Sequence, residues 1–120
     1  MKKIAILPLY QAPHYAEQVT DWLWQAFGEG LSREFFHSII EHSQTPGALP
    51  LTFIAVEDEK LVGTVGLWRC DLITRQDLFP WLAALYVDDA SRGKGLAGKL
   101  QQHVITWAAQ AGYEELHLWS

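Results

Sequence analysis

Several residue types that define whole classes of protein are scarce in this 120-residue chain. Cys70 is the single cysteine, so no disulfide framework can form within the chain, and a reducing compartment, the cytoplasm, is expected. Nine Lys and Arg stand against fourteen Asp and Glu, and no basic stripe is present to neutralise nucleic-acid phosphates. Apolar runs fall far short of the roughly 18–20 residues of a membrane span, and no signal-peptide pattern is visible. We therefore expect neither nucleic acid nor membrane as a partner.

The residues that are present indicate one small globular domain over residues 1–120. The chain is long enough for a single hydrophobic core but not for two. Its 49% apolar residues, with 6 Trp, 4 Tyr and 5 Phe, exclude a disordered chain. The five histidines have no metal-ligand spacing, so no metal is expected. The net charge of −5 would suit a cationic, amine-bearing substrate.

Apolar periodicity and turn residues predict a mixed α/β fold with the order β-α-α-β-β-β-α-β. Helical spacing predicts a helix from near Pro13 to Phe27 that buries an apolar stripe including Ala26 and Phe27. Ser32 is the expected N-cap of a second helix that buries Phe35, Phe36, Ile39 and Ile40. The expected strands are 4–9, 51–57, 61–69, 81–87 and 115–119, and a third helix is expected over 92–111.

A glycine-bearing turn between a strand and the third helix is the main functional signal. Gly93 and Gly95 lie between the predicted strand Trp81–Val87 and the predicted helix. Free backbone N–H groups at the positive end of a helix dipole bind anions, and a glycine lets a phosphate approach the backbone closely. Arg92 and Lys94 add positive charge. The alternative is a tight strand-to-helix turn without a ligand.

The run Arg92-Gly-Lys-Gly-Leu-Ala97 resembles the Gln/Arg-x-x-Gly-x-Gly/Ala signature of the GNAT superfamily of acyl-CoA-dependent N-acyltransferases, and the likeness extends over residues 85–100. The resemblance implies a GNAT fold in which the turn amides hold the pyrophosphate of coenzyme A (CoA). It also implies that strand amides hold the pantetheine arm, and that one N–H near Val87 polarises the thioester carbonyl. The CoA-binding residues implied in this way are Leu85, Tyr86, Val87, Arg92, Gly93, Lys94, Gly95, Leu96 and Ala97.

The same resemblance implies an enzyme that transfers an acetyl group from acetyl-CoA to a primary amine of a small molecule, by direct attack in a ternary complex. Histone-modifying members carry a glutamate base near the start of the fourth strand, where this chain has Trp81. A water chain ending on Glu57, Asp71 or Asp77 is the expected substitute. Two alternatives stay open: a CoA-binding sensor or degenerate module with little turnover, and a dimerisation domain with a vestigial glycine turn.

The sequence ends at Ser120, directly after the predicted fifth strand. The resemblance implies one more helix and two more strands, with a tyrosine that protonates the leaving thiolate. We therefore expect an incomplete GNAT fold and slow turnover by these 120 residues. An uncovered fifth strand, 115–119, would favour pairing with a second copy, so a homo-oligomer is expected.

Overall fold

The computed structural model describes residues 4–28, 30–44, 50–68, 81–93, 95–113 and 117–118. The elements follow the predicted order. The strands are β1 (Ile4–Pro8), β2 (Leu51–Glu57), β3 (Lys60–Trp68), β4 (Trp81–Val87) and β5 (His117–Leu118). The helices are α1 (Ala16–Phe27), α2 (Arg33–His42) and α3 (Leu96–Gln110), with short 3-10 turns at Leu9–Gln11, Pro13–Tyr15 and Asp89–Ser91.

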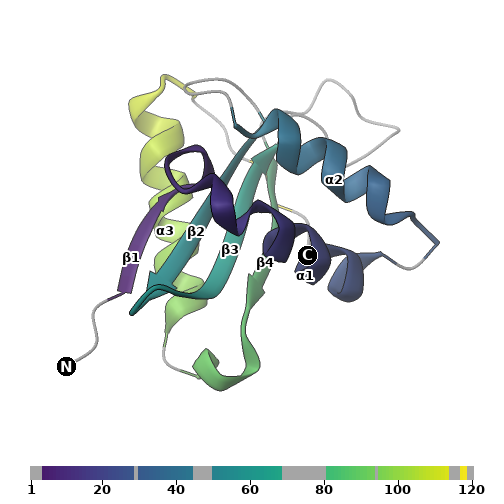
Figure 1. Cartoon of the computed structure of the whole chain (residues 1–120). Helices are drawn as coiled ribbons and strands as arrows, with labels where there is room; N and C mark the ends of the chain where they lie inside the picture. The colour runs from purple at the N-terminus through teal and green to yellow at the C-terminus, as the bar shows by residue number, and fades with distance from the viewer. Residues whose placement is uncertain are drawn as a thin grey trace.

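The five strands form one sheet in the order β1-β2-β3-β4-β5. β1 to β4 pair antiparallel, while β5 pairs parallel with β4. Asp58 and Glu59 form the β2–β3 turn, both with positive φ (50° and 66°), as the hairpin turns that match strand twist require. Helices α1 and α2 lie on one face of the sheet and α3 lies on the other (Figure 1).

Alternate residues of the strands supply two hydrophobic clusters, one on each face of the sheet, rather than the single core that the length of the chain predicts. Phe53 and Val65 point toward α3, where they pack with its buried face. Ile54 and Trp68 point toward α1 and α2. On α3 the buried residues are Leu96, Leu100, Val104 and Ala108. Because both faces are covered, β2 and β3 are almost continuously apolar.

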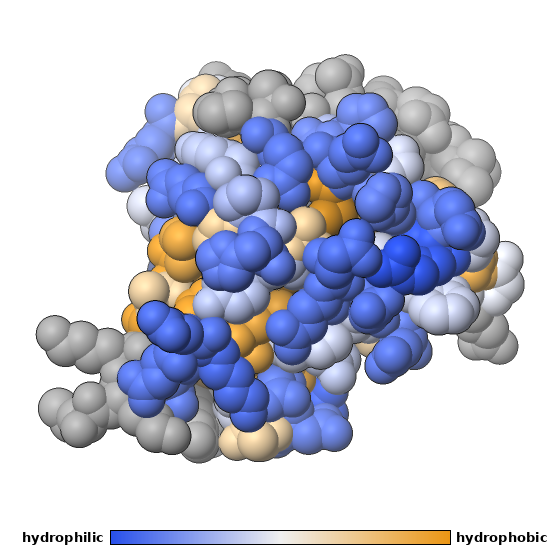
Figure 2. Space-filling model, in the orientation of Figure 1, coloured by the Kyte–Doolittle hydropathy of each residue, from blue (hydrophilic) through white to orange (hydrophobic). Residues whose placement is uncertain are grey.

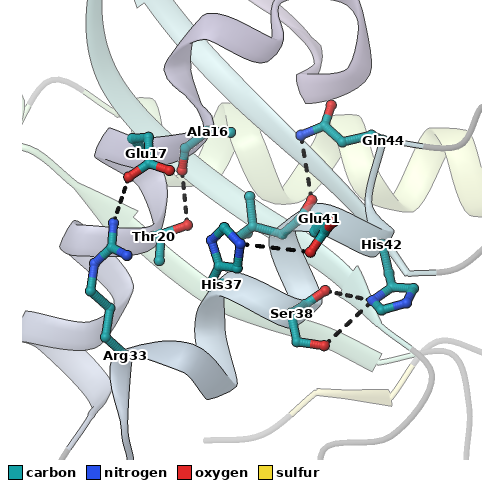
Figure 3. A network of polar contacts seen from close by, with 10 residues as sticks. Ala16, Glu17, Thr20, Arg33, His37, Ser38, Glu41, His42 and Gln44 are labelled. Carbon is teal, nitrogen blue, oxygen red and sulfur yellow. Dashed lines mark hydrogen bonds and ion pairs between the residues drawn. The ribbon is translucent and has the colours of Figure 1, made fainter.

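Polar contacts fix the two helices on the first face. The Ser32 hydroxyl accepts a hydrogen bond from the Phe35 N–H at 3.3 Å, which confirms Ser32 as the N-cap of α2. Arg33 donates to Asp21 at 2.7 Å and to Glu17 at 2.8 Å. Figure 3 shows Glu17 facing Arg33 across the gap between α1 and α2. The start of α2 is therefore bound to the outer side of α1.

Three residues predicted to be buried on these helices are exposed. Phe35 and Phe36 are consecutive residues of α2, so their side chains point in different directions. Phe36 turns toward the sheet and is buried, whereas Phe35 is 47% exposed. Ala26 and Phe27, in the last turn of α1, are also exposed. Both residues line a pocket together with Leu85–Val87 of β4, so the apolar spacing of α1 continues there without a packed core behind it. On the face that carries α1 and α2, hydrophilic residues predominate and apolar residues show between them (Figure 2).

The third helix begins four residues later than predicted. A 3-10 turn at Asp89–Ser91 and two glycines with positive φ precede it, so α3 begins at Leu96 rather than Arg92. Gly112, with φ +95°, follows the C-terminal end of α3, and this left-handed conformation is typical of a glycine that ends a helix. Of the predicted strand 115–119, the described part is His117–Leu118.

His103 makes the stability of the fold depend on pH. The His103 ring on α3 packs edge-to-face on Phe53, with centroids 4.9 Å apart, and burial lowers the pKa of His103 from 6.5. Between the lowered pKa and pH 6.5, the unfolded chain therefore binds more protons than the folded chain. The contribution of His103 to the free energy of unfolding is complete above pH 6.5 and decreases as the pH falls below 6.5. We expect a lower melting temperature one pH unit below about 6.5 than one unit above it. His103→Gln should reduce that difference, and an unchanged difference would contradict this assignment.

Candidate functional site

The end of β4 is shaped by a β-bulge. Thr64 of β3 pairs with Tyr86, whereas Gly66 pairs with Ala83, so two β4 residues oppose Val65. One of them is Ala84, with φ +54°, a left-handed conformation that is uncommon for a residue other than glycine. Bulges bend a strand and re-aim its following residues. Here the bulge is formed by Ala84 and Leu85, and the residues that follow it are Tyr86 and Val87.

The glycine turn after β4 leaves the start of α3 open. Gly93 and Gly95 have φ values of +82° and +77°, and a Cβ on either would meet nothing within 4 Å. Gly95 is the N-cap of α3 and offers no side-chain cap, unlike Ser32 at α2. The first N–H groups of a helix have no acceptor within it. The amides of the first turn of α3 therefore face an accessible surface at the positive end of the helix dipole.

Arg92 ties the glycine turn to the end of β4. Its Nε donates to the Val87 carbonyl oxygen at 2.9 Å, and its guanidinium lies 5.4 Å from the centroid of the Tyr86 ring. Nη1 also pairs with Asp89 at 2.7 Å. The Tyr86 ring contacts Trp22 of α1, with centroids 5.1 Å apart. Arg92 thus holds the strand end and the turn in one arrangement while its charge is partly balanced by Asp89.

Two adjoining pockets lie along this surface. The larger has a volume of about 430 Å³, within the size range of small-molecule sites. The smaller, of about 100 Å³, lies at the glycine turn. They share three lining residues, Val87, Arg92 and Ala97. The larger pocket is also lined by Ala26, Phe27, Leu85 and Tyr86, and the smaller by Ser91, Gly93, Gly95 and Leu96.

Eight of the nine predicted CoA-binding residues line these pockets, from Leu85 to Ala97. The ninth, Lys94, lies outside the described residues, as do the candidate bases Asp71 and Asp77. Glu57 ends β2, two strands away from β4, and lines neither pocket. The turn and the strand end thus come together as the sequence predicts, whereas the described pocket walls contain none of the three candidate bases.

Sequence reasoning missed three pocket residues. Ala26 and Phe27 follow the helical stripe of α1 and were expected in the core, but they line the larger pocket. Ser91, in the 3-10 turn before the glycines, is buried and lines the smaller one. Periodicity cannot separate a core position from a pocket wall, because both are apolar and lie on the same face of the helix.

Neither a metal site nor a membrane span is found in the described part of the chain. No group of three or more His, Cys, Asp or Glu side chains there is placed to hold a metal ion. None of the described helices combines the length and the apolar content needed to cross a bilayer. The charged side chain that lines the two pockets, among the described residues, is Arg92.

Comparison with known proteins matches the chain to one family. The family model described as acetyltransferase (GNAT) family matches residues 16–120. Among curated proteins, human N-acetyltransferase 8B is 38% identical over 66 residues. That match spans 55% of this chain and 29% of the human protein.

Solved structures share the fold. An aminoglycoside N-acetyltransferase in complex with CoA is 20% identical, with a TM-score of 0.71, over 100% of this chain and 77% of that one. A predicted acetyltransferase with acetyl-CoA from Clostridium acetobutylicum is 15% identical, with a TM-score of 0.70, over 100% and 81%. Ribosomal-protein-alanine N-acetyltransferase from Brucella melitensis is 24% identical, with a TM-score of 0.63, over 100% and 80%.

Proposed function

Because the chain belongs to the acetyltransferase (GNAT) family, we propose that it transfers an acetyl group from acetyl-CoA to a primary amine of a small molecule. The observation that carries the proposal is the open glycine turn at the start of α3, next to a 430 Å³ pocket. The smaller pocket would take the pyrophosphate and the larger one the pantetheine arm. Solved structures of the same fold contain CoA or acetyl-CoA, as their names state.

The backbone of the site suits an extended anionic ligand. The amides at Gly93 and Gly95 and in the first turn of α3 would donate to phosphate oxygens, because the dipole of the helix favours negative charge there. From the glycine turn, the pockets continue past Val87 to the end of α1. With the phosphates at the glycine turn, the reactive thioester lies toward that other end. The proposed role of the β4 amide near Val87 is to polarise the thioester carbonyl.

The transfer forms a bond between the amine nitrogen and the carbonyl carbon and breaks the carbon–sulfur bond of the thioester. The amine nitrogen attacks the carbonyl carbon, the carbonyl oxygen gains negative charge, and the carbon–sulfur bond then breaks to release the CoA thiolate. The amine loses a proton, which a water chain would carry to Glu57, Asp71 or Asp77. The thiolate takes up a proton from solvent or from an acid. The Arg92 anchor to the Val87 carbonyl would keep the strand end in place during these steps.

Two measurements test this proposal on the 120-residue chain. Titration calorimetry with CoA tests binding, and release of free thiol from acetyl-CoA in the presence of amines tests transfer. Binding with transfer supports the enzyme. Binding without transfer to any amine supports a CoA-binding module, and the absence of CoA binding would overturn the assignment of the glycine turn.

The Arg92 side chain should contribute measurably to CoA affinity. We expect Arg92→Ala to weaken CoA binding by about 1–2 kcal/mol, the scale of one charge-assisted hydrogen bond in a partly exposed site. The loss combines the missing charge with the missing anchor to Val87. Lys60→Ala is the control, because it removes the same charge at a residue that pairs with Asp88. Equal CoA affinities of the two variants would contradict a role for Arg92.

Cytoplasmic location and association of two copies are also proposed. The described residues of β5 form an edge of the sheet, and an edge strand offers unpaired backbone groups to a second copy. Such an interface would lie next to the start of β4, where β5 pairs with Trp81 and Leu82.

A further inference from the structure

Three exposed apolar side chains surround the junction of α1 and α2. Trp24, Phe27 and Leu31 are 42%, 45% and 45% exposed, and we refer to them as the apolar elbow. Trp24 and Phe27 are three residues apart on α1, so they lie on the same side of the helix. The Trp24 indole N–H donates to the Leu31 carbonyl oxygen at 3.2 Å. This hydrogen bond ties the Trp24 ring to the connection between α1 and α2.

The apolar elbow continues into the larger pocket. Phe27 belongs to both, and Ala26 beside it also lines the pocket. The opposite end of the two pockets is the glycine turn, where the phosphates would bind. A ligand anchored at Gly93 and Gly95 thus extends toward Phe27. An acceptor that approaches the thioester from solvent at this end meets the elbow.

The charged side chains near the Phe27 end of the larger pocket do not suit a substrate that carries several positive charges. Among the described residues, Arg92 is the charged member of the pocket walls, and it is paired with Asp89. On the outer side of α1, Arg33 binds the carboxylates of Glu17 and Asp21. Glu34, in the first turn of α2, is an exposed carboxylate that lines neither pocket. Multiple ammonium groups would find few partners on these walls, whereas an apolar body would cover Phe27.

We propose that the acceptor is a primary amine attached to an aromatic or aliphatic body, and that Phe27 selects it. This inference rests on the proposed acetyl transfer and names the substrate class of the same site. It distinguishes this chain from the aminoglycoside N-acetyltransferase that shares its fold, since an aminoglycoside carries several cationic amines. Burial of an apolar group against Phe27 would stabilise the complex in proportion to the area removed from water.

The test compares two amines on the full 120-residue chain. Binding of 2-phenylethylamine and of spermidine is measured by saturation-transfer NMR, with and without CoA, and thiol release is measured with acetyl-CoA. We expect 2-phenylethylamine to bind at least about tenfold more tightly than spermidine, a difference of about 1.4 kcal/mol. Where transfer occurs, kcat/KM should follow the same preference. Equal binding of the two amines, or tighter binding of spermidine, would overturn the inference.

Two variants separate the elbow from general effects. Phe27 also lines the pocket proposed for the pantetheine arm, so amine binding by the variants is compared without CoA. Phe27→Ala should then weaken 2-phenylethylamine binding about tenfold. Ile105→Ala, at a similarly exposed apolar residue of α3 outside both pockets, should leave amine binding unchanged. Equal amine binding by the two variants would refute a role for Phe27. If the unsubstituted chain does not bind CoA, the proposed function is refuted. The inference about the amine is still tested in that case, because amine binding is also measured without CoA.

Discussion

Gly95→Glu is expected to weaken CoA binding at least about 100-fold, or about 2.8 kcal/mol. Gly95 is the N-cap of α3 with φ +77°, and its missing side chain leaves the turn amides accessible. A glutamate there places a negative charge and added bulk where a phosphate would bind, so it repels the ligand and covers its donors. Calorimetry with CoA, on protein whose helix content is checked by circular dichroism, measures the effect.

Gly112→Glu is the matched control for this substitution. Gly112 also has positive φ, and a Cβ there would meet nothing within 4 Å, but it lies at the opposite end of α3. Both variants force glutamate into a left-handed conformation, so both carry a similar backbone cost. CoA affinity should be retained in Gly112→Glu. If Gly95→Glu bound CoA as tightly as Gly112→Glu, the glycine turn would not be the phosphate site.

Phe53→Ala should lower the free energy of unfolding by about 3–5 kcal/mol. Phe53 is fully buried in β2, where His103 and Trp107 of α3 pack edge-to-face on its ring. Removal of the ring leaves a cavity between the sheet and α3. Urea denaturation followed by circular dichroism measures the loss, which is a large part of the total stability of a domain this size.

Phe35→Ala provides the comparison within the same residue type. Phe35 is 47% exposed on α2, so its truncation removes little buried area and should change the free energy of unfolding by less than about 0.5–1 kcal/mol. A similar loss in both variants would mean that Phe35 is buried. A small loss in Phe53→Ala would mean that the sheet and α3 are not tightly packed.

The order of elements could be predicted because each apolar pattern agrees with its place in the sheet. β2 and β4 begin and end at the predicted residues, since each apolar run there is bounded by polar or turn residues. The N-cap at Ser32 and the glycine after α3 were also predictable, because these residue types satisfy the ends of helices. The start of α3 was misplaced, since periodicity does not distinguish a 3-10 turn with two glycines from the first turn of a helix.

The residues that line the larger pocket were harder to predict from the sequence than the glycine turn. Glycines and a basic residue at fixed spacing define the turn through local backbone geometry. Ala26 and Phe27 become pocket residues only because the last turn of α1 meets the end of β4 across the larger pocket. The bulge at Ala84 likewise depends on the register between β3 and β4. Features of this kind arise from tertiary contacts, which a local pattern does not encode.

Tyr86 has a further thermodynamic consequence. Its ring contacts both Trp22 of α1 and the guanidinium of Arg92, so α1 and the turn before α3 meet at one side chain of β4. A molecule in the larger pocket touches α1, β4 and α3 together and is bound only when all three are in place. Occupancy and folding are then linked by mass action, at about 2.7 kcal/mol when the ligand is present at 100 times its Kd. The cellular level of the ligand would then help to set how long the folded chain survives proteolysis.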